Sequence, residues 1–321
     1  MFDLTAVQRK PIHQVILFIA GVLILFLCFH FASSVSMIVS NLHHHGQELV
    51  FDGANGSTSG GGSAGFNFLH FATPAPTITP TPTATPLPGT KRTSSIDGME
   101  SVFIPAGSFA MGVSGDATSG PSHKVTVSAF WINRTQVTNA MYALCVQAGV
   151  CQPPIRKAIN PHYYDPKYAD HPAVYIAWSL AEAYCEWTGG KLPTEAQWER
   201  AATNDGRRDF AWGNSLPRPD LSTVNNFFHT TTKVGSHPKG ASPFGVLDMG
   251  SDVREWVWDW YDPYYYNHSP SVNPTGPAHG KEKALRGASW EDDLSDAHAT
   301  RRYGHDPDSA GDNRGFRCAY P

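Results

Sequence analysis

The sequence HPAVYIAWSLAEAYCEWTGGKLPTEAQWERAA, residues 171–202, is the stretch from which we interpret the rest of the chain. Residues Trp178–Trp187 are predicted to be helical, and Gly189-Gly190 follow them in the position of a C-terminal helix cap. A second helix is predicted to start at Thr194, because Thr194 and Gln197 have the spacing of a capping box. Its core face is expected to include Ala196, Trp198 and Glu199.

Outside this stretch the expected elements are short. A third helix is predicted at Thr138–Ala148, and it should present Met141, Leu144 and Cys145. Strands are predicted at Ser101–Ile104, Val125–Ile132 and Ala284–Arg286. Gly, Pro, Asn and Asp recur every few residues and limit the length of regular elements. We therefore predict an irregular α+β domain, with four tryptophans as core residues: Trp198, Trp256, Trp258 and Trp260.

The N-terminal region contains an apolar run that is long enough to cross a membrane. From Val15 to Phe31 it has no formal charge, and a bilayer needs about 20 such residues. Arg9 and Lys10 precede the run, and the next Lys or Arg is Lys91. Because positive charge stays inside, residues 1–14 are expected in the cytoplasm, 15–39 in the membrane and the rest outside the cell. A cleaved signal peptide and a buried core helix are the alternatives.

Residues 40–95 are predicted to be a disordered linker. The first part is rich in Gly and Ser, and the second, TPAPTITPTPTATPLPGT, favours polyproline II geometry and acts as a spacer. His43, His44 and His45 could bind a metal ion, although a solvated linker is the simpler interpretation. Residues 96–321 have globular composition and form the predicted domain. The chain has a net charge of −4 and no basic cluster, so nucleic acid is not expected as a partner.

Ordered sequence blocks across residues 98–321 resemble one family. They are GMESVFIPAGSFAMG at 98–112, HKVTVSAFWINRTQVTNAMY at 123–142, the stretch at 171–202, VGSHPKGASPFGVLDMGSDVREWVWDWY at 234–261, LRGASW at 285–290 and DNRGFRCA at 312–319. This domain resembles the formylglycine-generating enzymes, also called sulfatase-modifying factor enzymes. The resemblance implies a fold related to that of C-type lectins.

The family's oxidation chemistry uses two copper-binding cysteines between the GGSW-like motif and GFRC. Thiolates are the ligands that hold Cu(I). In this chain the corresponding positions fall within seven residues that include no thiol: Glu291, Asp292, Asp293, Leu294, Ser295, Asp296 and Ala297. Copper is therefore not expected, and neither is conversion of cysteine to formylglycine.

The four cysteines of the predicted exported domain are interpreted as structural. Oxidising compartments favour disulfides. Cys185 and Cys318 match positions that are linked in family members, and Cys145 and Cys151 are close enough in sequence to pair. Cys28 lies in the predicted membrane span.

The resemblance also implies a calcium site at the motif DMGSDVREW. Carried over by position, Asp248 and Glu255 would supply carboxylates, and Ser251 and Val253 main-chain carbonyls, which suit Ca²⁺. A salt bridge or a surface turn is the alternative. A second family calcium site would use Asn225 or Asn226, but the loop that should supply its aspartate reads only HTTTK.

The family's substrate groove would lie beside Glu291–Arg302. The groove candidates are Trp290, Asp292, Asp296, His298, Arg301, Arg302 and His305. We expect a membrane-anchored binding or accessory module whose ligand is a peptide, a glycan or a protein. The alternative is a metal-dependent oxidoreductase acting on a protein or small thiol. In that case His298, His305 and one of Asp292, Asp293 or Asp296 would form a facial triad for iron.

Overall fold

The computed structural model describes residues 84–154, 161–225 and 230–321. All of them lie within one folded unit, Thr79–Pro321. The predicted membrane span, residues 15–39, and the histidines at 43–45 lie outside the described residues. In the described ranges, no helix combines the length and the apolar character needed to cross a bilayer.

The first sheet joins strands from both ends of the domain. Its antiparallel strands have the order β1 (Lys91–Thr93), β2 (Glu100–Ile104), β5 (Phe130–Asn133) and β10 (Ala319–Tyr320). The sequence had placed the end of the linker at residue 95, whereas Lys91 pairs with Val102 and Thr93 with Glu100. Lys91–Thr93 therefore belong to the domain and not to the linker. Their polar composition is typical of a linker, but they form a strand because they pair with β2.

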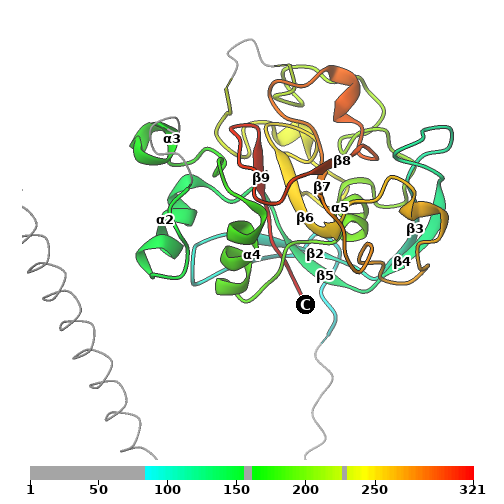
Figure 1. Ribbon diagram of the computed structural model, residues 1–321, viewed down its shortest axis with the longest axis horizontal. Helices are drawn as coiled ribbons and strands as arrows, with labels where there is room; N and C mark the ends of the chain where they lie inside the picture. Colours follow the sequence, from blue (N-terminus) through cyan, green and yellow to red (C-terminus); the bar gives the residue numbers. More distant parts are fainter. Residues whose placement is uncertain (1–83, 155–160, 226–229) are drawn as a thin grey trace, which may run out of the picture. The chain divides into compact units, whose positions relative to one another are not determined.

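The second sheet is built from the C-terminal third of the domain. Its order is β8 (Arg302–His305), β7 (Lys283–Arg286), β6 (Arg254–Trp260) and β9 (Arg314–Phe316). β9 runs parallel to β6, and the other pairs are antiparallel. A separate hairpin pairs β3 (Gly107–Met111) with β4 (His123–Val127). Figure 1 shows this hairpin on the opposite side of the domain from α2 and α3.

The strand predicted at Val125–Ile132 is two strands in different sheets. β4 ends at Val127 and β5 begins at Phe130. At the break, the main-chain N–H of Ser128 donates to the side-chain oxygen of Asn273, 2.8 Å away. That bond takes Ser128 out of the strand ladder, so the chain can turn from one sheet to the other.

The helices are α2 (Asn139–Gln147), α3 (Pro161–Tyr164), α4 (Trp178–Trp187) and α5 (Glu195–Thr203), with 3-10 turns η1 (Pro166–Tyr168), η2 (Pro238–Gly240), η3 (Tyr265–Asn267) and η4 (Leu294–Ala297). α4 has the predicted bounds, and the capping box of Thr194 and Gln197 is formed. In α2, Cys145 is buried, whereas Leu144 is 40% exposed. Adjacent helical residues point about 100° apart, and the buried direction is that of Cys145.

Helix α5 lies in the middle of the domain, where it packs against β3, β4, β6 and β7 (Figure 1). Trp198 of α5 and Trp256 of β6 are fully buried, as expected for core residues. Trp258 and Trp260 are only partly buried. With Trp178 they surround the ammonium group of Lys283, which lies 3.8 Å from the Trp178 ring centroid and 4.1 Å from that of Trp260.

Two buried acids of α5 are neutralised by arginines from the second sheet. Arg302 binds the Glu195 carboxylate through two nitrogens at 2.9 and 2.7 Å, and Arg286 lies 2.6 Å from Glu199. Burial pushes the pKa of Glu195 upward, but Arg302 and then Arg286 more than offset it, so that the pKa is lowered. These ion pairs fasten α5 to β7 and β8.

Candidate functional site

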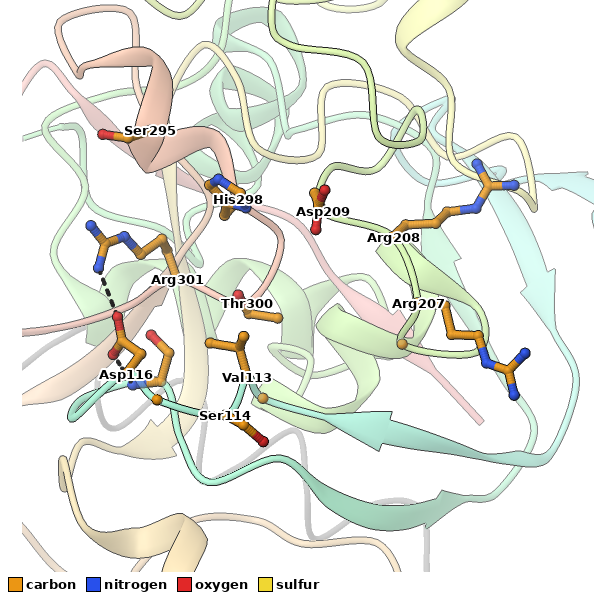
Figure 2. A pocket seen from close by; sticks show the side chains of 14 residues that line it. Val113, Ser114, Asp116, Arg207, Arg208, Asp209, Ser295, His298, Thr300 and Arg301 are labelled. Atoms are coloured by element: carbon orange, nitrogen blue, oxygen red, sulfur yellow. Dashed lines mark hydrogen bonds and ion pairs between the residues drawn. The ribbon is translucent and has the colours of Figure 1, made fainter.

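An open pocket of about 470 Å³ lies where three loops meet (Figure 2). The first loop, residues 112–119, follows β3, and the second, residues 206–209, follows α5. The third, residues 295–301, contains the end of η4 and leads into β8. Three residues proposed from the sequence, Ser295, His298 and Arg301, line this pocket.

Main-chain contacts hold the three loops together. The N–H of Ala110 donates to the carbonyl of Asp205, and the N–H of Ala299 donates to the carbonyl of Asp209. Gly206 has φ of 78°, and a Cβ atom there would overlap the carbonyl oxygen of Ala110. Glycine is thus required at this position for the second loop to approach β3 so closely.

One wall of the pocket carries an ion pair. Arg301 lies 3.2 Å from Asp116 and 3.6 Å from Asp296. The Asp116 carboxylate also accepts hydrogen bonds from the N–H groups of Ser119 and Thr118. These N–H groups, followed by the Thr118 hydroxyl and Arg301, hold the pKa of Asp116 below its usual value. Arg301 is therefore oriented toward the pocket wall by two carboxylates, as Figure 2 shows for Asp116.

On the opposite wall, the polar side chain of His298 rests on two aromatic rings. The ring of His298 packs 4.6 Å from that of Phe210, which stacks on Trp212 at 5.1 Å. In Figure 2, His298, Asp209 and Thr300 lie around the middle of the pocket. Within the described chain, no hydrogen bond is formed by the carboxylate of Asp209 or the ring of His298. Both groups are available to a ligand.

The loop Glu291–Ala297 is held in place by an ion pair. Arg254 binds Asp292 through two nitrogens, at 2.9 and 2.5 Å, and Asp292 also accepts from the N–H and hydroxyl of Ser289. Asp292 is only 8% exposed. Next to this pair, the hydroxyl of Tyr303 donates to Asp296 at 2.9 Å. Asp292 is thus a structural anion and not a groove residue, and Asp296 orients Tyr303 and Arg301.

The disulfides Cys145–Cys151 and Cys185–Cys318 are present. The second one connects α4 to the segment that follows β9. The described ranges contain these four cysteines, and each of them is therefore bonded to another.

Three other groove candidates lie outside the pocket. Arg302 is buried against Glu195, and its place in the groove was a wrong prediction. Side chains alternate along a strand, so Arg301 before β8 faces the pocket while Arg302 enters the core. The indole N–H of Trp290 donates to the carbonyl of Asp312, 3.3 Å away. His305 is half-buried, with its ring 6.3 Å from that of Trp256, and burial followed by Arg314 lowers its pKa.

The iron-triad hypothesis finds no support in this arrangement. Within residues 84–154, 161–225 and 230–321, no three His, Cys, Asp or Glu side chains are placed to hold a metal ion together. His298 lies in the pocket, whereas His305 is at the end of β8. Asp292 is bound to Arg254.

Two of the predicted calcium ligands, Glu255 and Ser251, already accept hydrogen bonds from other side chains. Glu255 is fully buried and accepts from Arg317 at 2.6 and 2.7 Å and from the indole N–H of Trp198 at 2.8 Å. The side-chain N–H₂ of Gln136 donates to Glu255 and to the carbonyls of Asp248 and Ser251, at 3.0, 3.0 and 3.3 Å. Two of the four expected ligands, the Glu255 carboxylate and the Ser251 carbonyl, are therefore already bonded to a guanidinium and an amide and do not fit a cation.

The second calcium position is equally unsupported. Asn225 is exposed with φ of 53°, and Asn226 lies outside the described residues.

Sequence reasoning missed most of the pocket. It did not identify Asp116 of the first loop or Arg207, Arg208 and Asp209 of the second. The runs VSGDATSG and NDGRRD are typical of turns, but nothing local indicates that these two turns meet a third one more than 85 positions later in the chain.

Comparison with known proteins agrees with this architecture. Residues 86–320 match the sulfatase-modifying factor enzyme 1-like domain. The chain belongs to this family. A relative in the family, the formylglycine-generating enzyme of Streptomyces coelicolor, is 32% identical over 282 residues, covering 68% of this chain and 88% of that enzyme. The solved structure of PvdO from Pseudomonas aeruginosa superimposes with a TM-score of 0.61 and 28% identity, over 73% of this chain and 99% of PvdO.

The family domain also occurs within longer proteins. The serine/threonine-protein kinase pkn1 of Chlamydia caviae is 32% identical over 237 residues, which cover 68% of this chain and 38% of that protein. The present chain thus spans about two fifths of the length of such relatives. The family resemblance inferred from the ordered sequence blocks is confirmed, as is the mixed α and β fold.

Proposed function

We propose that this chain displays a sulfatase-modifying factor domain outside the cytoplasm as a binding or accessory module. Its ligand site is the pocket formed by residues 112–119, 206–209 and 295–301. The observation that carries this proposal is that three loops meet around polar side chains that are open to a ligand, those of His298, Asp209 and Thr300. The adjacent loop, Glu291–Ala297, contains no thiol.

The pocket chemistry favours a polar ligand. Its volume of about 470 Å³ is within the usual range for small-molecule sites, roughly 300–1,000 Å³. Its walls combine hydroxyls, two carboxylates, three guanidinium groups and an imidazole that lies on an aromatic ring. Such a surface suits the hydroxyls of a glycan or the main chain and polar side chains of a peptide.

Copper-dependent oxidation of cysteine is not part of this proposal. The loop Glu291–Ala297 offers hydroxyl and carboxylate oxygens, which are hard ligands, where a soft thiolate pair is needed. Its buried carboxylate, Asp292, already has a guanidinium partner in Arg254. The four cysteines of the described domain are in disulfides and do not supply a thiolate.

Membrane display is proposed from the apolar run at Val15–Phe31 and from the basic residues before it. Disulfides are typical of exported domains and are consistent with this orientation. Protease added to intact cells should remove the folded domain, and extraction at alkaline pH should leave the chain in the membrane fraction. Recovery of the chain in the soluble fraction would contradict anchoring.

Ligand binding is tested with the full chain in detergent micelles on glycan and peptide arrays. Ser114→Trp places a large side chain in the pocket, whereas Ala117→Trp changes an exposed residue of the same loop that does not line it. We expect Ser114→Trp to weaken binding of a positive ligand at least tenfold and Ala117→Trp to leave it unchanged. Equal binding by both variants would place the ligand elsewhere on the domain.

The enzymatic alternative has a direct assay. A Cys-x-Pro-x-Arg peptide incubated with the chain and copper should remain unchanged by mass spectrometry. A peptide aldehyde that forms only when the chain is present would overturn the binding-module proposal. Stoichiometric iron or copper in the purified chain would favour the oxidoreductase alternative.

A further inference from the structure

Two arginines face each other across neighbouring strands of the second sheet. Arg254 of β6 and Arg314 of β9 are direct partners in the parallel ladder, so their side chains project from the same face. Trp256 and Phe316, two positions further along the same strands, share this face and are buried in the core. The two guanidinium groups therefore lie at the end of an apolar sheet face, directly opposite each other, which is unfavourable for like charges.

Only one of these arginines has an acidic partner. Arg254 binds Asp292 through Nε and Nη2, at 2.9 and 2.5 Å. No ion pair between described residues includes Arg314, and its guanidinium forms one hydrogen bond, from Nη2 to the hydroxyl of Ser309, that is 3.5 Å long. Nε of Arg314 is buried and makes no hydrogen bond to a described residue. The pair thus carries one positive charge that no ion pair neutralises.

The electrostatics of the surroundings agree with this surplus of positive charge. Burial lowers the pKa of Arg314, and the charge of Arg254 lowers it further. Asp312 and Glu291 offset this effect only in part, and both of them are exposed. On β8, burial followed by the charge of Arg314 also lowers the pKa of His305. The guanidinium of Arg314 nevertheless stays protonated at neutral pH, so it needs a counter-ion.

Both guanidinium groups are held in place with donors to spare. That of Arg254 lies over the ring of Tyr303, 4.0 Å from its centroid. That of Arg314 packs against the main chain at Gly311, where a Cβ atom would overlap Nη2. The Nη1 atoms of both arginines form no hydrogen bond to a described residue. Two oriented donor groups are therefore available to an anion.

We infer that Arg314 and Arg254 form a binding subsite for a carboxylate group. Guanidinium groups bind carboxylates through paired N–H donors, and one carboxylate neutralises the single surplus charge. A doubly charged phosphate would exceed that surplus. Neither arginine lines the pocket formed by residues 112–119, 206–209 and 295–301, so the subsite is separate from the proposed ligand pocket and does not depend on it.

The test compares two probes that differ by one charge, N-acetylglutamate α-amide and N-acetylglutamine α-amide. Their binding to the full chain in detergent micelles is measured by saturation-transfer NMR at low ionic strength, where screening is weak. We expect the glutamate probe to bind at least about tenfold more tightly, because charge-assisted hydrogen bonds are about twice as strong as neutral ones. Arg314→Gln should reduce its affinity to that of the glutamine probe.

Arg218→Gln is the matched control. It removes an equally charged side chain that is 60% exposed and pairs with Asp220, and it should bind the glutamate probe as the wild type does. Arg314→Met is a second variant with the same expectation as Arg314→Gln, should the latter not fold.

A second arm identifies the source of the carboxylate. Binding of a capped Ala-Ala-Glu-Ala-Ala peptide as tightly as the free probe would support the inference and assign the group to a protein ligand. Binding of the free probe alone would support it with a small organic acid as the ligand. Equal affinities of the wild type for the two N-acetyl probes would overturn the inference, because water would then solvate Arg314. Unchanged binding of the glutamate probe by a folded Arg314→Gln or Arg314→Met chain would overturn it as well.

Discussion

Replacing the neighbouring residues Arg301 and Arg302 by methionine should lower the stability of the domain to very different extents. Arg302→Met removes a guanidinium that is 0% exposed and that binds Glu195 through two nitrogens, at 2.9 and 2.7 Å. Arg302 also donates to the carbonyls of Thr118 and Asp262. Methionine fills the space of the aliphatic stem but leaves the Glu195 carboxylate with Arg286 alone, at 3.4 Å.

The magnitude follows from the burial of the pair. Removing one member of a buried ion pair costs about 3–5 kcal/mol, because the remaining charge stays desolvated. For a domain of this size, 1 kcal/mol shifts Tm by about 2–4 °C, so that Arg302→Met should lower Tm by about 10 °C. Arg301 is 35% exposed in its pair with Asp116, and exposed pairs contribute about 0–1 kcal/mol. Arg301→Met should therefore lower Tm by no more than about 4 °C.

Differential scanning calorimetry of the full chain in detergent provides the comparison, with urea unfolding followed by tryptophan fluorescence as a second probe. The double variant Glu195→Gln/Arg302→Met should recover part of the lost stability, because the glutamine no longer carries an unpaired buried charge. In a ligand-binding assay, Arg301→Met should weaken binding more than Arg302→Met does, because Arg301 lines the pocket wall. A loss below about 1 kcal/mol for Arg302→Met, or equal losses for both arginines, would refute this reasoning.

Two further predictions concern Lys283 and the disulfides. Burial lowers the pKa of Lys283 to about 8, so tryptophan fluorescence should change with a midpoint near pH 8, and Lys283→Met should abolish this transition. The amine has a pKa of 10.5 in the unfolded chain, which therefore binds more protons than the folded chain between pH 8 and 10.5. The contribution of Lys283 to stability should rise with pH in this range. Replacing Cys185–Cys318 by alanines should cost about 5 kcal/mol in urea unfolding, against about 2 kcal/mol for Cys145–Cys151, since the loops span 133 and 6 residues. Equal losses would contradict the loop-entropy argument.

Features that depend on a few neighbouring residues could be predicted from the sequence. Helix α4, the capping box of α5 and the strand at Ala284–Arg286 follow from spacings of at most ten residues. The family followed from sequence blocks in order, because many short motifs together are specific. The missing thiols between Trp290 and Cys318 were also evident, since an absent residue type needs no structure to detect.

The partners of charged side chains could not be predicted in this way. Glu255 was interpreted as a calcium ligand, but its partner Arg317 lies 62 positions away. Arg302 was placed in a groove, but its partner Glu195 lies 107 positions earlier. A buried carboxylate and an exposed one have the same sequence signature, and only the position of the opposite charge decides which is which.

The sequence by itself thus determined the family, the local helices and the absence of thiols between Trp290 and Cys318, because these depend on residue type and short spacing. Only the tertiary structure decided that residues 112–119, 206–209 and 295–301 form one pocket, and that Arg301 lines it while Arg302 does not. The physical reason is that loop convergence and burial result from packing between segments that are far apart in the sequence. The energy of that packing depends on both segments and cannot be inferred from either one alone.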